Sequence, residues 1–129
     1  LYRVEQILKA AQIKLRLNGD KREINMPTLA ENVISMCLKE AVTNIVKHSK
    51  ATICRINFYQ SDDEFKMTIQ DNGIGFKRSH ELEGGNGLKG MQERIEFING
   101  SLEIENGDGT TVVLKIPLAI THQKGENKR

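Results

Sequence analysis

A long helical pattern, followed at once by two strand patterns, is the feature that most constrains the fold of this chain. Over residues 28–48 the apolar side chains recur at helical spacing. Residues 52–59 and 64–71 alternate between apolar and polar side chains, and the polar run at 61–63 predicts a tight turn between them. Such a hairpin has one apolar face, which it can bury against the preceding helix. The pattern therefore predicts a helix packed on an antiparallel hairpin.

The flanking segments extend both layers. Residues 1–11 have helical spacing, residues 13–17 alternate, and residues 87–99 again have helical spacing. Two further strands, around 102–104 and over 110–116, are joined by an Asn-Gly-Asp-Gly turn. We therefore expect an α+β fold, a two-layer sandwich in which about three helices cover one face of a mixed, mostly antiparallel sheet.

The chain length of 129 residues suits one hydrophobic core. We expect a single domain over residues 1–120 and a polar, frayed tail over residues 121–129. The chain begins at Leu1, without an initiator methionine and already in helical rhythm, which favours a fragment of a longer protein whose other domains, membrane domains included, are missing. No apolar run reaches the roughly 18 residues of a membrane span, so we do not expect this segment itself to be inserted.

The charge and the cysteines exclude some classes of function. A net charge of +2, from 19 basic and 17 acidic residues, gives no broad positive field for nonspecific nucleic-acid binding. An anionic ligand would have to be held locally. Cys37 and Cys54 lie in apolar patterns without the spacing of zinc ligands, so we expect buried free thiols rather than a disulfide or a zinc site.

A polar stripe runs beside the apolar face of the long helix. Its members, at helical spacings of four, seven and eight residues, are Glu40, Asn44, Lys47 and His48. Carboxylate and amide oxygens suit Mg²⁺, and a lysine suits phosphate. A solvated helix edge is the alternative interpretation for the charged members. Asn44 favours the ligand-binding interpretation, because an asparagine in mid-helix costs about 0.5 kcal/mol relative to alanine unless its side chain has a role.

The strand at 64–71 ends with an acid in a core position. Its apolar face consists of Phe65, Met67 and Ile69. Asp71 is next in that register, so its side chain should point between the layers, where an ionised carboxylate is costly without hydrogen-bond donors. The amino group of an adenine would supply a donor, and the amides of an Asp-Asn-Gly turn are the alternative. Gly73 and Gly75 would let the backbone approach a flat ligand closely.

The third helical pattern opens with a glycine-rich turn. Gly85, Asn86 and Gly87 would present free N–H groups and the positive end of the helix dipole to an anion, as in a triphosphate cradle. Gly85, Gly87 and Gly90 also fit the dinucleotide-binding pattern GxGxxG, but the segment before them is polar and loop-like rather than a strand. We therefore do not expect a dinucleotide-binding fold.

The last strand repeats the break seen at Asp71. Val112, Leu114 and Ile116 share one face, and Thr110 stands in the same register just before them. A threonine alone is typical of any strand. Its agreement with Asp71 predicts a second polar group at the same end of the apolar layer.

Taken together, these motifs resemble the ATPase domain shared by histidine kinases, Hsp90-type chaperones, DNA gyrase and the mismatch-repair MutL proteins. Four segments of the chain resemble the conserved boxes of this domain, in the same order. They are EAVTNIVKH at 40–48 (N box), DNGIGF at 71–76 (G1 box), GNGL at 85–88 (G2 box) and GDGTT at 107–111 (last glycine box). The short segment between the G1 and G2 boxes and the run GLKGMQER at 87–94 are most similar to sensor kinases paired with NarL-type response regulators.

The resemblance implies binding of ATP with Mg²⁺ and transfer of the γ-phosphate to a histidine in two-component signalling. It implies that Asn44 binds Mg²⁺, that Glu40 positions the phosphate acceptor or a water, and that Lys47 neutralises phosphate. Asp71 would accept a hydrogen bond from the adenine amino group, and Thr110 would contact the base through a water. The boxes also assign to the nucleotide His48, Gly73, Gly75, Phe76, Gly85, Asn86, Gly87 and Leu88.

The chain departs from the family pattern in one place. The separate phenylalanine-containing box found between the G1 and G2 boxes of many histidine kinases is absent, although Phe76 follows Gly75 directly. The contacts of Lys77, Arg78 and His80 in this short lid are left open.

The phosphate acceptor is expected on another domain. None of the three histidines, His48, His80 and His122, lies on a dimerisation helix. The partners that the resemblance implies are a separate dimerisation and phosphoacceptor domain and, indirectly, a NarL-type response regulator, for a cytoplasmic domain of a membrane-anchored parent. Two alternatives remain at this point: a serine kinase of the same superfamily that acts as an anti-sigma factor, and a scaffold or docking domain that binds no nucleotide.

Overall fold

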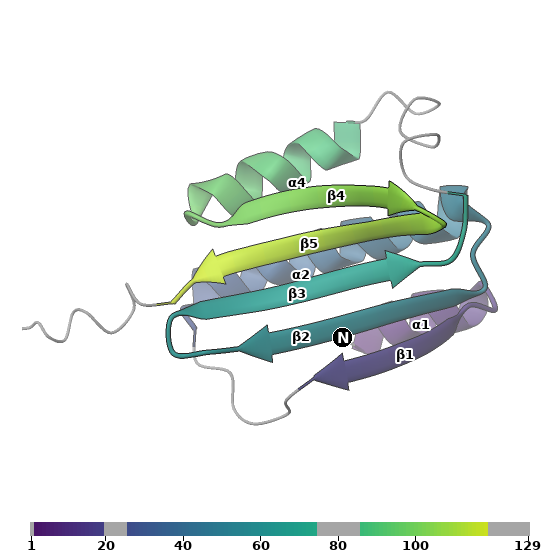
Figure 1. Cartoon of the computed structure of the whole chain (residues 1–129), viewed down its shortest axis with the longest axis horizontal. Helices are drawn as coiled ribbons and strands as arrows, with labels where there is room; N and C mark the ends of the chain where they lie inside the picture. Colours follow the sequence, from purple (N-terminus) through teal and green to yellow (C-terminus); the bar gives the residue numbers. More distant parts are fainter. Residues whose placement is uncertain (1, 20–25, 75–85, 119–129) are drawn as a thin grey trace, which may run out of the picture.

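The structure is a computed structural model that describes residues 2–19, 26–74 and 86–118 (Figure 1). The helices and strands, in chain order, are α1 (Tyr2–Ala10), β1 (Lys14–Gly19), α2 (Thr28–Asn44), the π-helix η1 (Ile45–Ser49), β2 (Ile53–Gln60), β3 (Glu64–Asp71), α4 (Asn86–Phe97), β4 (Ser101–Gly107) and β5 (Gly109–Pro117). This order agrees with the predicted sequence of helices and hairpins.

The strands form one five-stranded sheet in the order β1-β2-β3-β5-β4. β1 pairs with β2 in parallel, and the other three pairs are antiparallel. α1 and α2 lie behind the sheet in Figure 1, and α4 runs beside β4. The predicted α+β sandwich, with a mixed, mostly antiparallel sheet, is confirmed.

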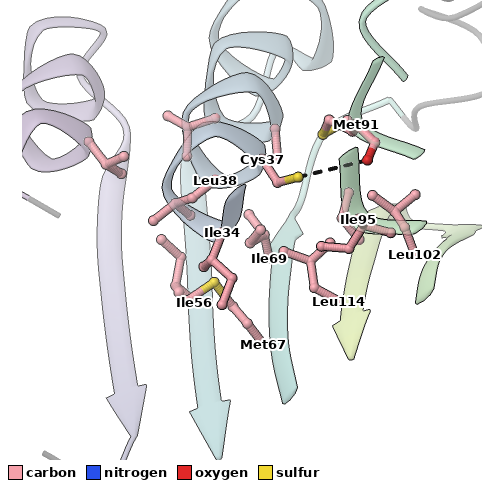
Figure 2. Packing of buried hydrophobic residues seen from close by; sticks show 14 of the residues in the cluster. Ile34, Cys37, Leu38, Ile56, Met67, Ile69, Met91, Ile95, Leu102 and Leu114 are labelled. Carbon is pink, nitrogen blue, oxygen red and sulfur yellow. Dashed lines mark hydrogen bonds between the residues drawn. The ribbon is translucent and has the colours of Figure 1, made fainter. Parts of the chain in front are cut away.

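One hydrophobic core lies between the helices and the sheet. Side chains from α2, α4 and the strands meet there, as Figure 2 shows for Leu38, Ile95 and Leu114. Leu8 from α1 and Ile56 from β2 are fully buried in the same core. Burying each such side chain contributes about 1.5–3 kcal/mol. This packing holds α2 against the sheet and so places the end of α2 beside the strands.

The end of the long helix differs from the prediction. The α-helical part stops at Asn44, and residues 45–49 form the π-helix η1, which ends at Lys50 in the left-handed conformation with a φ of 58°. A π-helical turn contains an extra residue, so side chains beyond Asn44 are rotated relative to an α-helix. The predicted stripe of four polar side chains on one α-helical face is therefore interrupted after Asn44.

Both cysteines are buried free thiols, as predicted. Burial raises the pKa of Cys37 to about 11 and that of Cys54 to about 12. Both side chains therefore remain protonated thiols near neutral pH and pack as small apolar groups. Within the part of the chain that the structure describes, no helix is both long and apolar enough to cross a membrane.

Candidate functional site

A recess opens between the end of the long helix and the ends of two central strands. α2 and η1 form one wall, and β3 and β5 form the other. The residues that line the recess are Ala41, Asn44, Ile45, Ser49, Ile69, Asp71, Thr110 and Val112. The recess thus brings together Asn44, Asp71 and Thr110, three residues that the sequence motifs placed in one site. Its free volume is about 10 Å³, close to the room that one water molecule needs.

Asp71 is the last residue of β3 and is only 6% exposed, which confirms that it points between the layers. The backbone N–H of Gly73 donates a 2.7 Å hydrogen bond to its Oδ1. Burial nevertheless raises the pKa of Asp71, and the backbone N–H groups of Gly73 and Thr110 only partly oppose this effect. The turn amides therefore satisfy the carboxylate only in part. An ionised carboxylate can accept about four hydrogen bonds, so capacity remains for a donor on a ligand.

Thr110 lies beside Asp71. The register of β3 and β5 pairs Gln70 with Thr111, which makes Asp71 and Thr110 the next neighbours across the two strands. Thr110 is 5% exposed, and its Oγ1 has no hydrogen-bond partner within the described residues. A buried hydroxyl without a partner costs about 1–3 kcal/mol. The recess thus contains an unsatisfied hydroxyl next to a buried carboxylate that is only partly hydrogen-bonded, and a polar ligand or a water could bond to both.

Two glycines let the backbone close around Asp71. A Cβ at Gly73 would overlap the carbonyl oxygen of Ser49, and a Cβ at Gly109 would overlap the carbonyl oxygen of Asp71. Gly109 also has a φ of 132°, which few other residues adopt. The glycine that the G1 box assigns to the nucleotide therefore has a packing role as well, because it allows η1 to approach the turn after β3.

Asn72 holds the turn after β3 to the start of β2. Its Oδ1 accepts hydrogen bonds from the backbone N–H groups of Thr52 (2.9 Å) and Ile53 (3.0 Å). Its Nδ2 donates to Oγ1 of Thr52 at 2.9 Å. The side chain of Asn72 is therefore used within the protein, and the sequence motifs did not predict this role.

Ser49 is a second residue near Asp71 to which the sequence analysis assigned no role. It is buried, lines the recess, and its Oγ donates to the carbonyl oxygen of Ile45 at 2.8 Å while accepting from the backbone N–H of Ala51 at 3.1 Å. Its carbonyl oxygen accepts a 2.7 Å hydrogen bond from the backbone N–H of Ile74. The one signal in the sequence was its position directly after the N box.

The other predicted site residues lie around the recess or outside the described ranges. Glu40 lies one turn before Asn44 and lines a second pocket, between α2 and α4. Lys47 is exposed on η1 and lines neither pocket. Asn86 and Gly87 are the first residues of α4, and Leu88 packs half-buried against the core.

Several predictions fall on residues whose structure is not described. These are Gly75, Phe76, Lys77, Arg78, His80 and Gly85, the tail at 121–129, and the side chains of His48 and Asn86.

Comparison with known proteins identifies the family. The sequence model of the histidine kinase-, DNA gyrase B-, and HSP90-like ATPase family matches residues 30–120. The chain is 44% identical over 117 residues to Sensor histidine kinase DesK of Bacillus subtilis (91% of the chain, 32% of DesK). It is 42% identical over 118 residues to Sensor histidine kinase YvfT of the same organism (92% of the chain, 31% of YvfT). The chain thus spans about a third of the length of these relatives.

Solved structures agree with the fold. The histidine kinase domain of a blue-light activated kinase from Erythrobacter litoralis has a TM-score of 0.77 at 20% identity, covering 98% of this chain and 62% of that chain. The catalytic domain of histidine kinase ThkA has a TM-score of 0.69 at 13% identity, covering 91% of this chain and 86% of that chain.

The two sequence relatives above are both sensor histidine kinases, which favours the sensor module over an anti-sigma serine kinase. The family match includes α2, β3, α4 and β5, the elements that carry the recess and the predicted boxes. The chain therefore belongs to the histidine kinase-, DNA gyrase B- and HSP90-like ATPase family, as the ATPase catalytic domain of a sensor histidine kinase.

Proposed function

We propose that this domain binds Mg-ATP with its adenine at the recess and donates the γ-phosphate to a histidine on a separate dimerisation and phosphoacceptor domain. The observation that carries the proposal is the meeting of Asn44, Asp71 and Thr110 in one recess, with Asp71 buried and Thr110 Oγ1 unpartnered within the described residues. Both polar groups are unfavourable without a ligand, which supports their use in binding one.

The walls and floor of the recess suit an adenine. Ala41, Ile45 and Val112 give it apolar walls. The carboxylate of Asp71 would accept a hydrogen bond from the exocyclic amino group of the base. Because the free volume is close to that of one water, we propose that a water fills the floor, bonded to Thr110, while the base covers the mouth.

The phosphates need charge neutralisation beyond the recess. Asn44 is half-buried, and its amide oxygen is the type of ligand that Mg²⁺ accepts when phosphate and water complete its shell. Mg²⁺, when bound, would supply positive charge at the phosphates. Lys47 is an exposed cation three residues farther along the chain, and the free N–H groups at the start of α4 could donate hydrogen bonds to a phosphate.

The transfer step moves one phosphoryl group. A lone pair on the acceptor imidazole nitrogen attacks the γ-phosphorus, and a phosphorus–nitrogen bond forms. The bond from the γ-phosphorus to the oxygen that bridges to the β-phosphate breaks, and ADP leaves with that electron pair. The carboxylate of Glu40 would orient the imidazole and take its remaining N–H proton. Positioning and charge neutralisation supply most of the rate enhancement in such reactions.

The partners extend beyond this domain. We propose that the acceptor histidine, a membrane anchor and the contacts with a NarL-type response regulator belong to other parts of the signalling system. The relatives are about three times as long as the chain and are sensor kinases, which supports this arrangement.

A calorimetric titration with a nonhydrolysable ATP analogue, with and without Mg²⁺, tests the proposal. We expect Mg²⁺ to tighten binding to the wild type, and Asn44→Ala to remove most of that gain. Asn32→Ala is the matched control, because Asn32 is an exposed asparagine on the same helix. No binding by folded wild-type protein would contradict the proposal and favour the scaffold alternative.

A further inference from the structure

A second pocket lies between α2 and α4 and has a volume of about 330 Å³. Lys39, Glu40 and Thr43 line it from α2, and Gly90 and Arg94 line it from α4. Cys37 and Met91 form its buried side, where the Cys37 thiol faces the carbonyl oxygen of Met91 at 4.0 Å, as Figure 2 shows. The pocket is large enough for a phosphate group or a side chain.

Glu40 and Arg94 face this pocket with opposite charges. Burial has the largest effect on the pKa of the Cys37 thiol and raises it, while the nearby charge of Arg94 lowers this pKa and that of Glu40 raises it. No ion pair joins the two side chains among the residues with a described structure. Two opposite charges that share a pocket without pairing leave room for a charged group between them.

Gly90 brings the Arg94 guanidinium towards the start of α4. A Cβ at Gly90 would lie 3.4 Å from Nη1 of Arg94, so the guanidinium covers the position of residue 90. Helical side chains lean towards the N-terminus of their helix, which explains this direction. The positive charge therefore lies about one turn closer to the beginning of α4 than the Cα atom of Arg94 does.

The two pockets lie on consecutive turns of α2. Asn44 lines the recess beside Asp71, and Glu40 lines the α2–α4 pocket. Four residues of α-helix correspond to a rise of about 6 Å. A nucleotide with its base at the recess and its phosphates running along α2 would bring its terminal phosphate to the second pocket.

We propose that the α2–α4 pocket receives the γ-phosphate and that Arg94 is a catalytic residue that contacts it; this inference rests on the proposed function. A carboxylate at Glu40 would repel a phosphate in the same pocket, and Arg94 offsets that repulsion. The guanidinium donates hydrogen bonds to the non-bridging oxygens while the bond to the β-phosphate breaks and the bond to the imidazole nitrogen forms. Arg94 neither gains nor loses a proton in this step.

Titrations with ADP and with the nonhydrolysable imido analogue of ATP, both with Mg²⁺, test this assignment because they differ in the γ-phosphate. We expect Arg94→Gln to weaken binding of the ATP analogue about tenfold, in line with the loss of a charge-assisted hydrogen bond, and binding of ADP less than about twofold. Arg94→Lys keeps the positive charge and should recover most of the affinity for the ATP analogue that Arg94→Gln loses. Arg55→Gln, on the far side of the sheet, should change neither affinity.

Each contrary outcome has a distinct meaning. Equal losses for both nucleotides, or no loss for either in a folded Arg94→Gln protein, would overturn the assignment of Arg94 while leaving the proposed function in place. A γ-phosphate-dependent loss in Lys39→Ala and none in Arg94→Gln would assign the contact to the other cation of the pocket. Failure of the folded wild type to bind both nucleotides would overturn the proposed function itself.

Discussion

The backbone N–H of Ile74 donates a 2.7 Å hydrogen bond to the carbonyl oxygen of Ser49. This bond joins the turn that follows Asp71 to the last residue of η1. A side chain at Gly73 would overlap the same carbonyl oxygen. The residue directly after the N box is therefore joined to the G1 box by a backbone hydrogen bond.

Replacing Gly73 with alanine should break this contact. We expect Gly73→Ala to lower the free energy of unfolding by about 1–3 kcal/mol, because the backbone of Ser49 cannot move aside as a flexible side chain would. Gly107→Ala is the control, since a Cβ there meets nothing within 4 Å, and it should change stability by less than about 0.5 kcal/mol. Urea unfolding of both variants checks this, and equal stabilities would contradict it.

Asn72 should matter for binding although its side chain is turned away from the recess. Asn72→Ala removes three hydrogen bonds, two to Thr52 and one to Ile53, and should cost about 1–2 kcal/mol of stability. It should also weaken binding of an ATP analogue several-fold, about 1 kcal/mol, by loosening the turn that holds Asp71. Asn72→Asp keeps the acceptor oxygen but loses the Nδ2 donor, so its stability and affinity should lie between those of Asn72→Ala and wild type. Wild-type stability and wild-type affinity of Asn72→Ala would contradict the role of these hydrogen bonds in holding the turn.

Thr110→Val should raise the stability of the ligand-free protein and weaken its binding of the ATP analogue. Valine has nearly the shape of threonine but lacks the unpartnered hydroxyl, so the ligand-free protein should gain up to about 1 kcal/mol in its free energy of unfolding. The same change should weaken binding of the ATP analogue, because the proposed bridging water loses a partner. Thr111→Val, on the neighbouring position of β5, is the control for binding. Thermal unfolding and calorimetry test the pair, and a destabilised Thr110→Val that binds normally would oppose the account.

The buried carboxylate of Asp71 should give the ligand-free protein a characteristic pH dependence. Because burial raises its pKa above the ordinary value of 3.8, the native state holds this proton more tightly than the unfolded state does. The resulting stabilisation is complete below that ordinary value and is lost as the pH rises through the raised pKa. We therefore expect the stability of the wild type relative to Asp71→Asn, measured by urea unfolding, to fall as the pH rises above 3.8 through the raised pKa. A difference that is constant or grows over this range would contradict the prediction.

The elements that follow a single period could be predicted from the sequence. The strand at 64–71 agrees with β3 residue for residue, because Phe65, Met67 and Ile69 alternate strictly with polar neighbours. The burial of Asp71 and Thr110 could be predicted for the same reason, since each interrupts an otherwise apolar register. The π-helical turn could not be predicted, because a helical period extrapolated from α2 assumes one geometry up to His48.

The supporting residues depend on contacts between distant segments. Asn72 forms hydrogen bonds with Thr52, which lies 20 residues away in the chain, so the Asp-Asn-Gly sequence alone does not predict them. Arg94 belonged to a family-like run, but its place beside Glu40 depends on how α4 packs against α2. Periodicity predicts which face of an element is buried, and it does not predict which neighbours meet there.

The central claim is that Asp71 recognises the base of ATP, and calorimetric titration of Asp71→Asn with an ATP analogue at neutral pH tests it most directly. An amide at this position would turn a donor towards the adenine amino group, so the account predicts binding at least about tenfold weaker than wild type. The same variant should lose at most about 0.5 kcal/mol of stability relative to wild type. Asp62→Asn, in the exposed turn between β2 and β3, is the control and should bind the ATP analogue as the wild type does. Wild-type affinity in a folded Asp71→Asn protein would contradict the account.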